Sequence, residues 1–473
     1  MKTSGTWKPA DKNRGIMAEK HLHTLFLKLP YPLRVSIINL YGYILSRKRF
    51  NKTFDIYLKK FLETQWMSPE KIKELQFVRL SELLEFSYQN VPYYKKLFDK
   101  CGLKPKDIQA PSDLEKIPLL TKKIIRENFK DLLAINVRKS DIELTSSSGT
   151  TGEKLMFYLP KVLKYQINFA ITYRFYSWAG VKPFDRRVTI GGRVFTKHRP
   201  YWVFNRAENQ LLFSIHHLGY DTVDEYIETM KKFAPVFIQG HPSGVAFVAK
   251  RLKEIGKTIP VKAIFTTGES LFDDQRKMME EGFSCRVFDT WGLGESAASA
   301  NECELHAGYH EDSEYGLIEF VETEKGYEVV GTSLFNYAMP FIRYRIEDIV
   351  EVMPVDQQSC KCGRGLPLKI KKVTGRIDDQ LTTSSGKIIL PVTMRMVIKP
   401  LLLEGESYQL IQLSDNKFVF KIASPNLRQD RTQFFYDTVV GILGHDIKVD
   451  IEKVSQIEMS GGKFRNIINL AKK

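Results

Sequence analysis

A run of small and hydroxylated residues near position 150 has the composition of a loop that binds phosphate groups. The run reads Ser146-Ser147-Ser148-Gly149-Thr150-Thr151-Gly152-Glu153-Lys154. Small residues let the backbone approach a polyphosphate, hydroxyl and N–H groups donate to its oxygens, and Lys154 adds positive charge. It is not the P-loop of kinases and GTPases, because no Gly-Lys-Ser/Thr closes it. Taken alone, the run fits a surface turn at least as well, so it decides little.

Four further segments follow along the chain, and their order makes the pattern informative. They are Trp291-Gly292-Leu293-Gly294-Glu295, Arg343-Tyr344-Arg345-Ile346-Glu347-Asp348, Gly375-Arg376-Ile377-Asp378-Asp379 and Gly461-Gly462-Lys463-Phe464-Arg465. Together with the hydroxyl-rich run, they resemble the motifs of the adenylate-forming superfamily, which includes acyl-CoA synthetases, adenylation domains and luciferases. Each segment is weak alone, but five in the family's order are hard to obtain by chance.

The resemblance implies a role for each segment. In the family the aromatic residue at Trp291 packs on adenine, Glu295 holds magnesium, and Asp348 binds the ribose hydroxyls. Lys463 corresponds to the catalytic lysine, and Arg376 is expected to reach the nucleotide. The other positions that the resemblance assigns to ATP or AMP are Ser146, Ser147, Ser148, Gly149, Thr150, Thr151, Gly152, Lys154, Gly268, Glu269, Asp289, Thr290 and Gly292.

Within the superfamily the chain resembles phenylacetate-CoA ligases and their capsule-polysaccharide-biosynthesis relatives. The segments that carry this likeness are Val91-Pro92-Tyr93-Tyr94, Ile117-Pro118-Leu119-Leu120-Thr121-Lys122 and Asn336-Tyr337-Ala338-Met339-Pro340. Three positions depart from the family pattern: Lys154 stands where Pro is usual, Trp291 replaces Tyr, and Glu347 stands where Gly is usual before the ribose aspartate.

The residue types suit the activation of a carboxylic acid. A carboxylate is a poor electrophile, and attack on the α-phosphate of ATP converts it to an anhydride whose leaving group is AMP. This step forces anions together, so cations and dipoles must stabilise the charge. Magnesium on Glu295, the loop donors and Lys463 would supply them, and coenzyme A is the expected acyl acceptor. The small domain that carries Lys463 is expected to move between the two steps, as in the family.

The acyl site is expected in loops that follow predicted strands, where ligands bind in α/β sheets. Ile238-Gln239-Gly240-His241-Pro242-Ser243 and Thr266-Thr267-Gly268-Glu269 are two such loops. His241 and Pro242 are the candidates for contact with the substrate. A packed loop histidine is an equally good interpretation of His241.

Three cysteines and a histidine form a candidate zinc site. Cys360 and Cys362 lie two positions apart, and Cys303 lies upstream with His306 and His310 nearby. Three thiolates and one imidazole make a closed tetrahedral set of the structural type. The pattern also resembles zinc-binding members of the same branch, in which Tyr309-His310 matches better than His306, although the sequence leaves the choice open. Reduced, unligated thiols are the alternative.

The chain length and the alternation of helical and β-rich patterns predict the architecture. At 473 residues the chain is too long for one core. Helical patterns alternate with short β-rich runs through the middle, which predicts an α/β fold with a largely parallel sheet. The β-rich runs are Arg187–Ile190, Val236–Gln239, Ala263–Thr267 and Arg286–Asp289. We expect an N-terminal helical extension (1–60), a large adenylation domain with mixed sheets (61–378) and a small mobile α+β domain (379–473).

The N-terminal region combines apolar residues at helical spacing with basic flanks. Ile37, Leu40, Tyr41 and Ile44 recur at i, i+3, i+4 and i+7, and no signal peptide or spanning segment precedes them. We expect a helix docked on the main domain, with contact to an anionic membrane surface as the alternative. The net charge of +16 favours anionic partners, but no nucleic-acid module stands out. Five cysteines in so long a chain fit the cytoplasm, with peripheral contact at the inner membrane face as its variant.

The preferred function is therefore acid plus ATP giving acyl-AMP and pyrophosphate, followed by transfer to coenzyme A. One rival is an acyl- or aminoacyl-transferring polysaccharide-modification protein that uses a pre-activated donor. Another is a membrane-peripheral scaffold whose catalysis has lapsed. The identity of the acid, the acceptor and the oligomeric state lie beyond what one sequence can specify.

Overall fold

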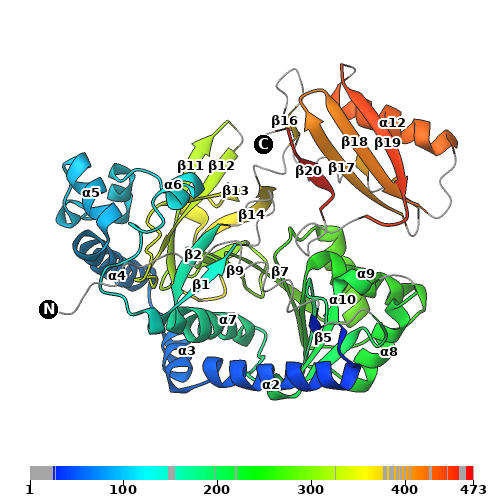
Figure 1. Ribbon diagram of the computed structural model, residues 1–473, viewed down its shortest axis with the longest axis horizontal. Coiled ribbons are helices and arrows are strands. Elements are labelled where there is room, and N and C mark those ends of the chain that lie inside the picture. Colours follow the sequence, from blue (N-terminus) through cyan, green and yellow to red (C-terminus); the bar gives the residue numbers. More distant parts are fainter. Residues whose placement is uncertain are drawn as a thin grey trace.

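The chain folds into a large body and a smaller C-terminal lobe (Figure 1). The computed structural model describes residues 25–26, 28–147, 155–195, 198–218, 221–324, 326–376, 381–382, 388–389, 394, 397–398, 401–403, 406–424, 429–444, 446–457 and 465–471. The large body contains one long sheet, and the lobe has a sheet of its own. The predicted α/β fold class, with a large mixed domain and a small α+β one, is confirmed.

Helices make up the N-terminal part of the chain. They are α2 (Tyr31–Arg49), α3 (Lys52–Thr64), α4 (Pro69–Asn90), α5 (Pro92–Cys101) and α6 (Lys122–Glu127). The ends of α4 follow from local chemistry, because Ser68 accepts a hydrogen bond from Lys71 N and Pro69 needs no partner in the first turn. The chain breaks between α4 and α5 at Val91, since proline disfavours helical geometry at the residue before it.

A sheet of twelve strands forms the large body, in the order β11-β12-β13-β14-β10-β9-β8-β7-β6-β3-β5-β4. One half holds β3 (Arg187–Gly191), β4 (Trp202–Asn205), β5 (Gln210–Ser214), β6 (Phe237–Gly240), β7 (Ala263–Thr267) and β8 (Arg286–Gly292). The other half holds β9 (Ser299–Glu302), β10 (Tyr309–Glu311), β11 (Gly316–Thr323), β12 (Gly326–Ser333), β13 (Tyr344–Val352) and β14 (Leu368–Arg376). Strands β5, β3, β6, β7 and β8 run parallel, and from β8 onward the pairing is antiparallel. The strand pairing in the sheet therefore changes from parallel to antiparallel at β8.

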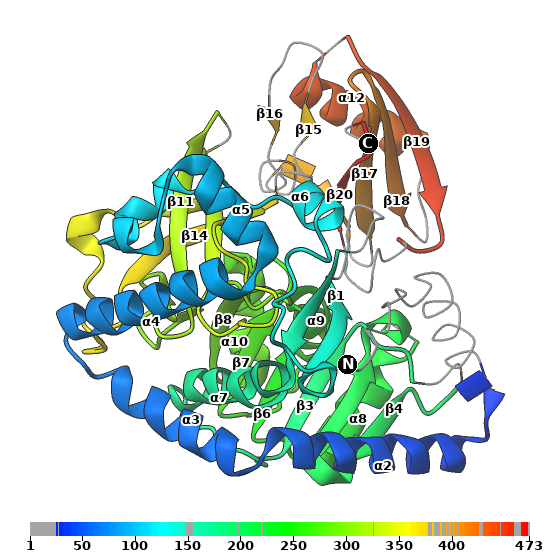
Figure 2. The ribbon, with the colours of Figure 1, turned by 60° about the vertical axis from the view of Figure 1, so that its left-hand side comes forward.

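Helices cover both faces of the parallel half (Figures 1 and 2). They are α7 (Asn168–Ser177) on one face and α8 (Val223–Phe233), α9 (Pro242–Glu254) and α10 (Asp273–Phe283) on the other. Alternating strand residues separate the two cores: Phe265 belongs to the core on the α7 face, whereas Ile264 belongs to the core under α8 to α10. This double coverage explains why the predicted parallel strands read as apolar runs.

A hairpin of β1 (Ile142–Ser146) and β2 (Met156–Pro160) precedes α7. It packs against the segment that leads into β13. The Tyr158 amide points at Met339 Sδ, and the rings of Phe157 and Phe341 lie 5.8 Å apart. The turn of this hairpin spans the hydroxyl-rich run, so the fold fixes both ends of that run.

The C-terminal lobe is an α+β unit built on four strands ordered β19-β18-β17-β20. Its elements are β15 (Leu381–Thr382), β16 (Ile388–Ile389), β17 (Ser407–Ser414), β18 (Lys417–Ala423), α12 (Gln429–Leu443), β19 (Lys448–Val454) and β20 (Ile467–Asn469). One face of the sheet packs on α12 through Phe420 and Phe435. The lobe therefore has its own hydrophobic core.

Helix α2 lies along the edge of the sheet beside β4 and α8 (Figure 2). It contacts β4 through hydrogen bonds: Tyr31 Oη donates to the Trp202 carbonyl and Asn39 Nδ2 donates to the Phe204 carbonyl. The predicted docked helix is therefore present. Leu45 is buried on its inner side, whereas Leu33, Ile37, Leu40 and Ile44 are exposed. Within the described residues, no helix combines the length and apolar composition that crossing a bilayer requires.

Candidate active site

Two of the predicted nucleotide segments meet through one hydrogen bond. Trp291, at the end of β8, donates from Nε1 to Asp348 Oδ2 on β13 at 2.9 Å. Both side chains are buried. The residues expected at the adenine and at the ribose therefore lie side by side, although β8 and β13 are not neighbours in the sheet.

The predicted magnesium ligand lies in the same neighbourhood. Glu295 is buried just after β8, and Tyr344 Oη donates to Glu295 Oε1 at 3.5 Å. Tyr344 begins β13, the strand that also contains Asp348. Arg376 ends β14, and its backbone is paired with that of Asp348. Four predicted positions from three segments thus converge at the ends of β8, β13 and β14.

Backbone geometry explains the glycine that the family usually has before the ribose aspartate. Glu347 has a φ of 70°, in the left-handed region that glycine enters at little cost. The Glu347 carboxylate pairs with Lys122 Nζ, and both side chains are about a quarter exposed. The departure at Glu347 therefore preserves the backbone turn and adds an ion pair.

The hydroxyl-rich run is described only at its start. Ser146 ends β1, and Ser147 bonds with Leu155 in both directions: its amide donates to the Leu155 carbonyl, and its Oγ accepts from the Leu155 amide. Ser148, Gly149, Thr150, Thr151, Gly152 and Lys154 lie outside the described residues, and so does Lys463. Their predicted roles stay predictions.

The loop after β7 and the start of α9 hold each other in place. Glu269 Oε2 accepts a hydrogen bond from the Ser243 amide in the first turn of α9, and His241 Nδ1 lies 2.9 Å from the Thr267 carbonyl. Gly268 has a φ of 80°, which its position between these contacts requires. Pro242 is buried as the first residue of α9. His241, the candidate substrate contact, is therefore a packed loop residue in this structure.

Asp289 lies on the face of β8 away from α7, and its side chain is enclosed. Its carboxylate accepts hydrogen bonds from Thr266 Oγ1 at 2.5 Å and from Tyr309 Oη at 2.7 Å. Burial, together with the nearby Glu302 carboxylate, raises the pKa of Asp289 to about 7. The side chain supports the strand ends from beneath, and any contact with a nucleotide would come from the backbone.

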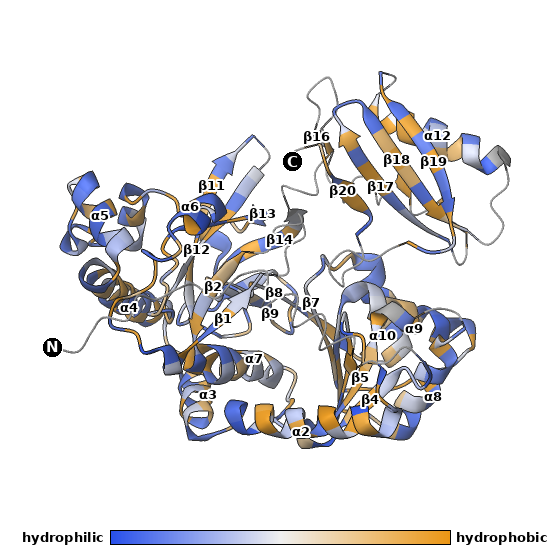
Figure 3. Cartoon of the chain, viewed as in Figure 1, coloured by the Kyte–Doolittle hydropathy of each residue, from blue (hydrophilic) through white to orange (hydrophobic). Residues whose placement is uncertain are grey.

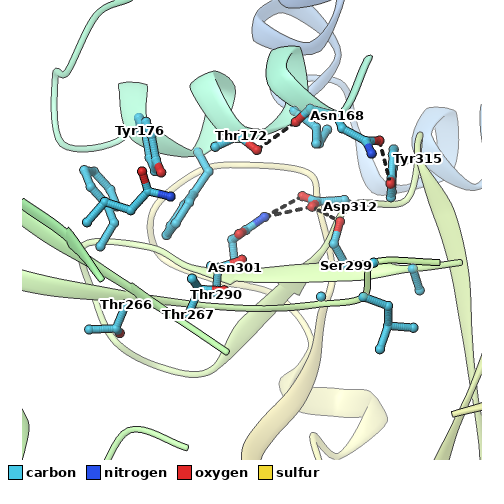
Figure 4. A pocket seen from close by; sticks show the side chains of 18 residues that line it. Asn168, Thr172, Tyr176, Thr266, Thr267, Thr290, Ser299, Asn301, Asp312 and Tyr315 are labelled. Atoms are coloured by element: carbon cyan, nitrogen blue, oxygen red, sulfur yellow. Dashed lines mark hydrogen bonds between the residues drawn. The ribbon is translucent and has the colours of Figure 1, made fainter. Parts of the chain in front are cut away.

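A cavity of about 310 Å³ lies between α7 and strands β6 to β9. Thr290, Gly292, Leu293 and Gly294, from the same segment as Trp291, form part of its wall. The opposite wall comes from α7, with Thr172 and Tyr176 among its residues (Figure 4). Neither His241 nor Pro242 lines it. Gln239, Thr266 and Thr267, which belong to the two predicted loops, do line the cavity.

Sequence reasoning missed most of the polar residues around this cavity. They are Asn168, Thr172, Tyr176, Ser299, Asn301, Asp312 and Tyr315. A signal was available only for Gln239, a polar residue that follows an apolar run and belongs to one of the two predicted loops. The residues on α7 and β9 gave no such signal, because they line the cavity only after α7 has packed on the sheet.

Comparison with known proteins identifies the chain's relatives. Residues 381–470 match the family model described as the CapK C-terminal domain. Protein CapK of Staphylococcus aureus is 25% identical over 421 residues, covering 85% of this chain and 89% of CapK. The phenylacetate-coenzyme A ligase of Thermus thermophilus is 24% identical over 459 residues, covering 87% of this chain and 99% of the ligase.

The chain is a homologue of CapK and of the phenylacetate-coenzyme A ligases. Its fold agrees with that relationship. The crystal structure of 2-hydroxyisobutyryl-CoA ligase in the postadenylation state, in complex with R3-HIB-AMP, superposes with a TM-score of 0.63 at 16% identity. The superposition covers 86% of this chain and 91% of that ligase.

This CapK homologue also contains a compact cluster of three cysteines and one histidine. The ligand atoms of Cys303, His310, Cys360 and Cys362 all lie within 4.8 Å of one another. Cys303 Sγ is 3.7 Å from Cys360 Sγ, and Cys362 Sγ is 3.6 Å from His310 Nε2. A tetrahedron with metal–sulfur bonds of about 2.3 Å has edges of about 3.8 Å. The spacing therefore fits a tetrahedral zinc ion.

The imidazole of His310 is oriented for metal binding. Nδ1 lies 2.7 Å from the Leu366 carbonyl and donates to it, so Nε2 is the nitrogen that faces the sulfurs. Burial opposes ionisation of the Cys362 thiol, but contact with His310 outweighs it and lowers the Cys362 pKa to about 6. His306 instead contacts Arg276 and Glu302. Of the two histidines between which the sequence left the choice open, His310 lies in the cluster and His306 does not.

Proposed function

We propose that the chain activates a small carboxylic acid with ATP as its acyl-adenylate and then transfers the acyl group to coenzyme A. The observation that carries this proposal is the hydrogen bond between Trp291 and Asp348, two residues 57 positions apart. It joins the segments that resemble the adenine and ribose motifs of adenylate-forming enzymes. Because the first segment also lines the cavity, a nucleotide held there and an acid in the cavity would share one wall.

The reaction has two displacement steps. A carboxylate oxygen attacks the α-phosphorus of ATP and pyrophosphate leaves. The coenzyme A sulfur, as thiolate, then attacks the acyl carbon and AMP leaves. The names of the ligase relatives support coenzyme A as the acceptor. In the first step the Ser146–Lys154 run would donate to the phosphates, and Lys463 and Arg376 would add positive charge where negative charge develops.

Glu295 suits the magnesium ion that ATP-dependent chemistry uses. It is a buried carboxylate beside the segment that lines the cavity, and the Tyr344 hydroxyl orients it. Magnesium binds through one or two carboxylates together with phosphate oxygens, and when bound it neutralises the charge of the triphosphate. Holding that carboxylate in place is the contribution of Glu295 and Tyr344.

Replacing the predicted catalytic lysine tests the proposal directly. Lys463→Ala is expected to lower pyrophosphate release by a hundredfold or more, since losing one well-placed charge typically costs roughly 10²–10³ in rate. ATP affinity, measured by calorimetry with magnesium, should change little. Lys453→Ala, which removes an exposed lysine of β19 in the same lobe, is the matched control.

Three results would contradict this proposal. Wild-type turnover in Lys463→Ala would remove that residue from the mechanism. Acyl transfer from a pre-activated donor without ATP would favour the polysaccharide-modifying acyltransferase instead. If neither ATP binding nor turnover were found, the chain would be a scaffold without catalysis.

We also propose that Cys303, His310, Cys360 and Cys362 hold a structural zinc ion. The four ligands close the coordination sphere, so the ion would organise the fold and take no part in the reaction. The loop that contains Cys360 and Cys362 already packs tightly: a side chain at Gly365 would lie 1.8 Å from the Met67 carbonyl oxygen. Zinc would tie this loop to β10 and the strand ends behind the cavity.

The outward face of α2 supports peripheral contact with an anionic membrane. Leu33, Ile37, Leu40 and Ile44 form a row of exposed apolar side chains, with Leu40 64% exposed. The hydrophobic stretches of α2 are visible along the edge of the molecule in Figure 3. No Asp or Glu occurs between positions 20 and 54, whereas basic residues flank the row. Apolar contact plus positive charge is the composition that binds anionic lipid surfaces. Together with the likeness to CapK, this placement suits a role in capsule or exopolysaccharide biosynthesis.

Vesicle flotation tests the membrane proposal. The wild-type protein should float with phosphatidylglycerol-containing vesicles at low salt and not with pure phosphatidylcholine vesicles. Leu40→Ser should weaken flotation, whereas Val355→Ser, which removes an apolar side chain 86% exposed elsewhere on the surface, should not. Failure of the wild type to float, or a dimer in light scattering that Leu40→Ser dissociates, would assign the row to another role.

A further inference from the structure

The cavity between α7 and the sheet has a polar floor. Thr267 on β7 lies directly opposite Thr290 on β8, and Thr290 lies opposite Asn301 on β9. Cross-strand partners point to the same face of a sheet. Two hydroxyl groups and one amide therefore stand in a row across three strands, facing α7 (Figure 4).

A buried ion pair holds this floor from behind. Asn301 Nδ2 donates to both carboxylate oxygens of Asp312, at 2.9 and 2.8 Å, and Ser299 Oγ also donates to Asp312. Arg174, on α7 and fully buried, pairs with Asp312 and with Glu314. These contacts occupy both carboxylate oxygens of Asp312, and Arg174 is shared between Asp312 and Glu314. Among the described residues that line the cavity, none is Lys or Arg.

Several polar groups around the cavity lack protein partners. Within the described part of the chain, no hydrogen bond is made by the Gln239 amide, the Tyr176 hydroxyl or the Thr290 hydroxyl, although each residue lines the cavity. By contrast, Thr172 donates to the Asn168 carbonyl, and Tyr315 donates to Asn168 Oδ1. A polar group that is sealed from water without a partner costs about 1–3 kcal/mol. A hydrocarbon ligand would impose this cost at three places.

We propose that this cavity takes the acyl part of a small polar carboxylic acid that carries hydroxyl or amide groups. The inference rests on the proposed acid activation and names its substrate class. A hydroxyl or amide on the acid pairs with Gln239, Tyr176 and Thr290 and replaces the hydrogen bonds that these groups would otherwise make to water. The cavity volume of about 310 Å³ corresponds to roughly ten water-sized groups. Long fatty acids are therefore excluded by size, and simple aryl and alkyl acids by polarity.

Pairs of acids that differ in one polar group test this inference. Pyrophosphate release would be measured with 2-hydroxyisobutyrate against 2,2-dimethylpropanoate, and with succinamate against 4-methylpentanoate, with phenylacetate as the apolar reference. At least one polar acid should exceed its apolar partner by about tenfold or more in kcat/KM, since about 1.4 kcal/mol corresponds to a factor of ten.

Two variants test whether the preference for polar over apolar acids arises in the cavity. Tyr176→Phe and Gln239→Leu each remove polar atoms with little change in volume, so each should reduce the polar-to-apolar ratio. Tyr226→Phe is the matched control, because it removes a buried tyrosine hydroxyl on the opposite face of the sheet, where that hydroxyl donates to the Ser214 carbonyl. It should leave the ratio unchanged.

The outcomes separate this inference from the proposed function. Faster turnover of the apolar acids, or ratios that neither Tyr176→Phe nor Gln239→Leu alters, would overturn the polar substrate class while leaving acid activation in place. No pyrophosphate release from any acid, combined with no ATP binding in calorimetry, would overturn the function and the inference together.

Discussion

Two polar regions of the large domain share strands β9 and β10 and differ in how their polar atoms are used. In the Cys/His cluster, every ligand atom faces another ligand atom, and the remaining nitrogen of His310 has its own acceptor. Two residues further along the chain, Asp312 supports the cavity floor, and there the Gln239 and Tyr176 side chains line the cavity without a hydrogen bond to another described residue. The polar atoms of the Cys/His cluster are all paired with one another or with the backbone, whereas, within the described residues, some of those around the cavity are not.

The difference separates architecture from recognition. Buried polar groups that are fully paired hold a fold in place, whereas polar groups left unpaired beside a cavity require a ligand or water. Both regions are rich in residues that can bind metals or take part in catalysis, so composition alone cannot tell them apart. The following predictions test each side of this contrast.

The largest loss of stability is expected when one ligand of the Cys/His cluster is removed. Protein purified without chelator should contain roughly one zinc ion per chain, and Cys362→Ser should lose it. The free energy of unfolding should fall by several kcal/mol, because zinc contributes roughly 10–16 kcal/mol in zinc-finger peptides. His306→Ala, which changes a neighbouring histidine outside the cluster, is the control for metal analysis and chemical denaturation. A metal-free, fully folded wild type would contradict the zinc assignment.

The next largest effect is expected at the ion pair behind the cavity. Arg174→Met leaves Asp312 and Glu314 buried without their cation, so the free energy of unfolding should fall by about 3–5 kcal/mol in urea denaturation. Arg251→Met, which breaks the surface pair with Asp224, should cost less than about 1 kcal/mol. Equal losses in the two variants would mean that the buried network contributes no more than a surface pair.

A smaller, pH-dependent effect is expected at Asp289. Its folded pKa is raised from 3.8 to about 7, so between these values the native protein holds a proton that the unfolded chain has released. This contribution to stability is full below pH 3.8 and is lost as the pH rises through about 7. Between pH 6 and 8 the wild type should lose about 1 kcal/mol relative to Asp289→Asn. Parallel pH profiles in urea denaturation would rule out a shift of this size.

The smallest effect is expected at the strained turn before Asp348. Glu347→Gly removes the ion pair with Lys122 but relieves the left-handed backbone, whereas Glu347→Ala removes the pair and keeps the strain. The glycine variant should therefore be more stable than the alanine variant by about 1 kcal/mol. Thermal denaturation measures the difference. The reverse order would show that the ion pair outweighs the backbone.

Much of the fold could be predicted from periodicity. The strands expected at Ala263–Thr267 and Arg286–Asp289 are present as β7 and β8, because local sequence determines them. Strands β1, β4, β9 and β10 were among those missed. They are short, and β9 and β10 owe their pairing to neighbours distant in sequence and contain charged residues such as Glu311 that are buried only because the fold pairs them.

The candidate site was predictable where a motif exists and hidden where none does. Trp291 and Asp348 were chosen from separate segments, and the structure brings them into contact. The sequence left the choice between His306 and His310 open, and the fold places His310 with the three cysteines and His306 beside Arg276 and Glu302. The polar cavity was not visible in the sequence, because Tyr176 and Asn301 meet there only after a helix packs on the sheet.

The contacts of α2 with strand β4 have a consequence for the behaviour of a shortened protein. β4 ends the twelve-stranded sheet, and Tyr31 and Asn39 donate to its outward carbonyls in place of another strand. A strand edge with unpaired backbone groups is a template for intermolecular pairing. A chain that starts after residue 50 would keep its cavity and its metal ligands, yet it would expose this edge and polymerise through it.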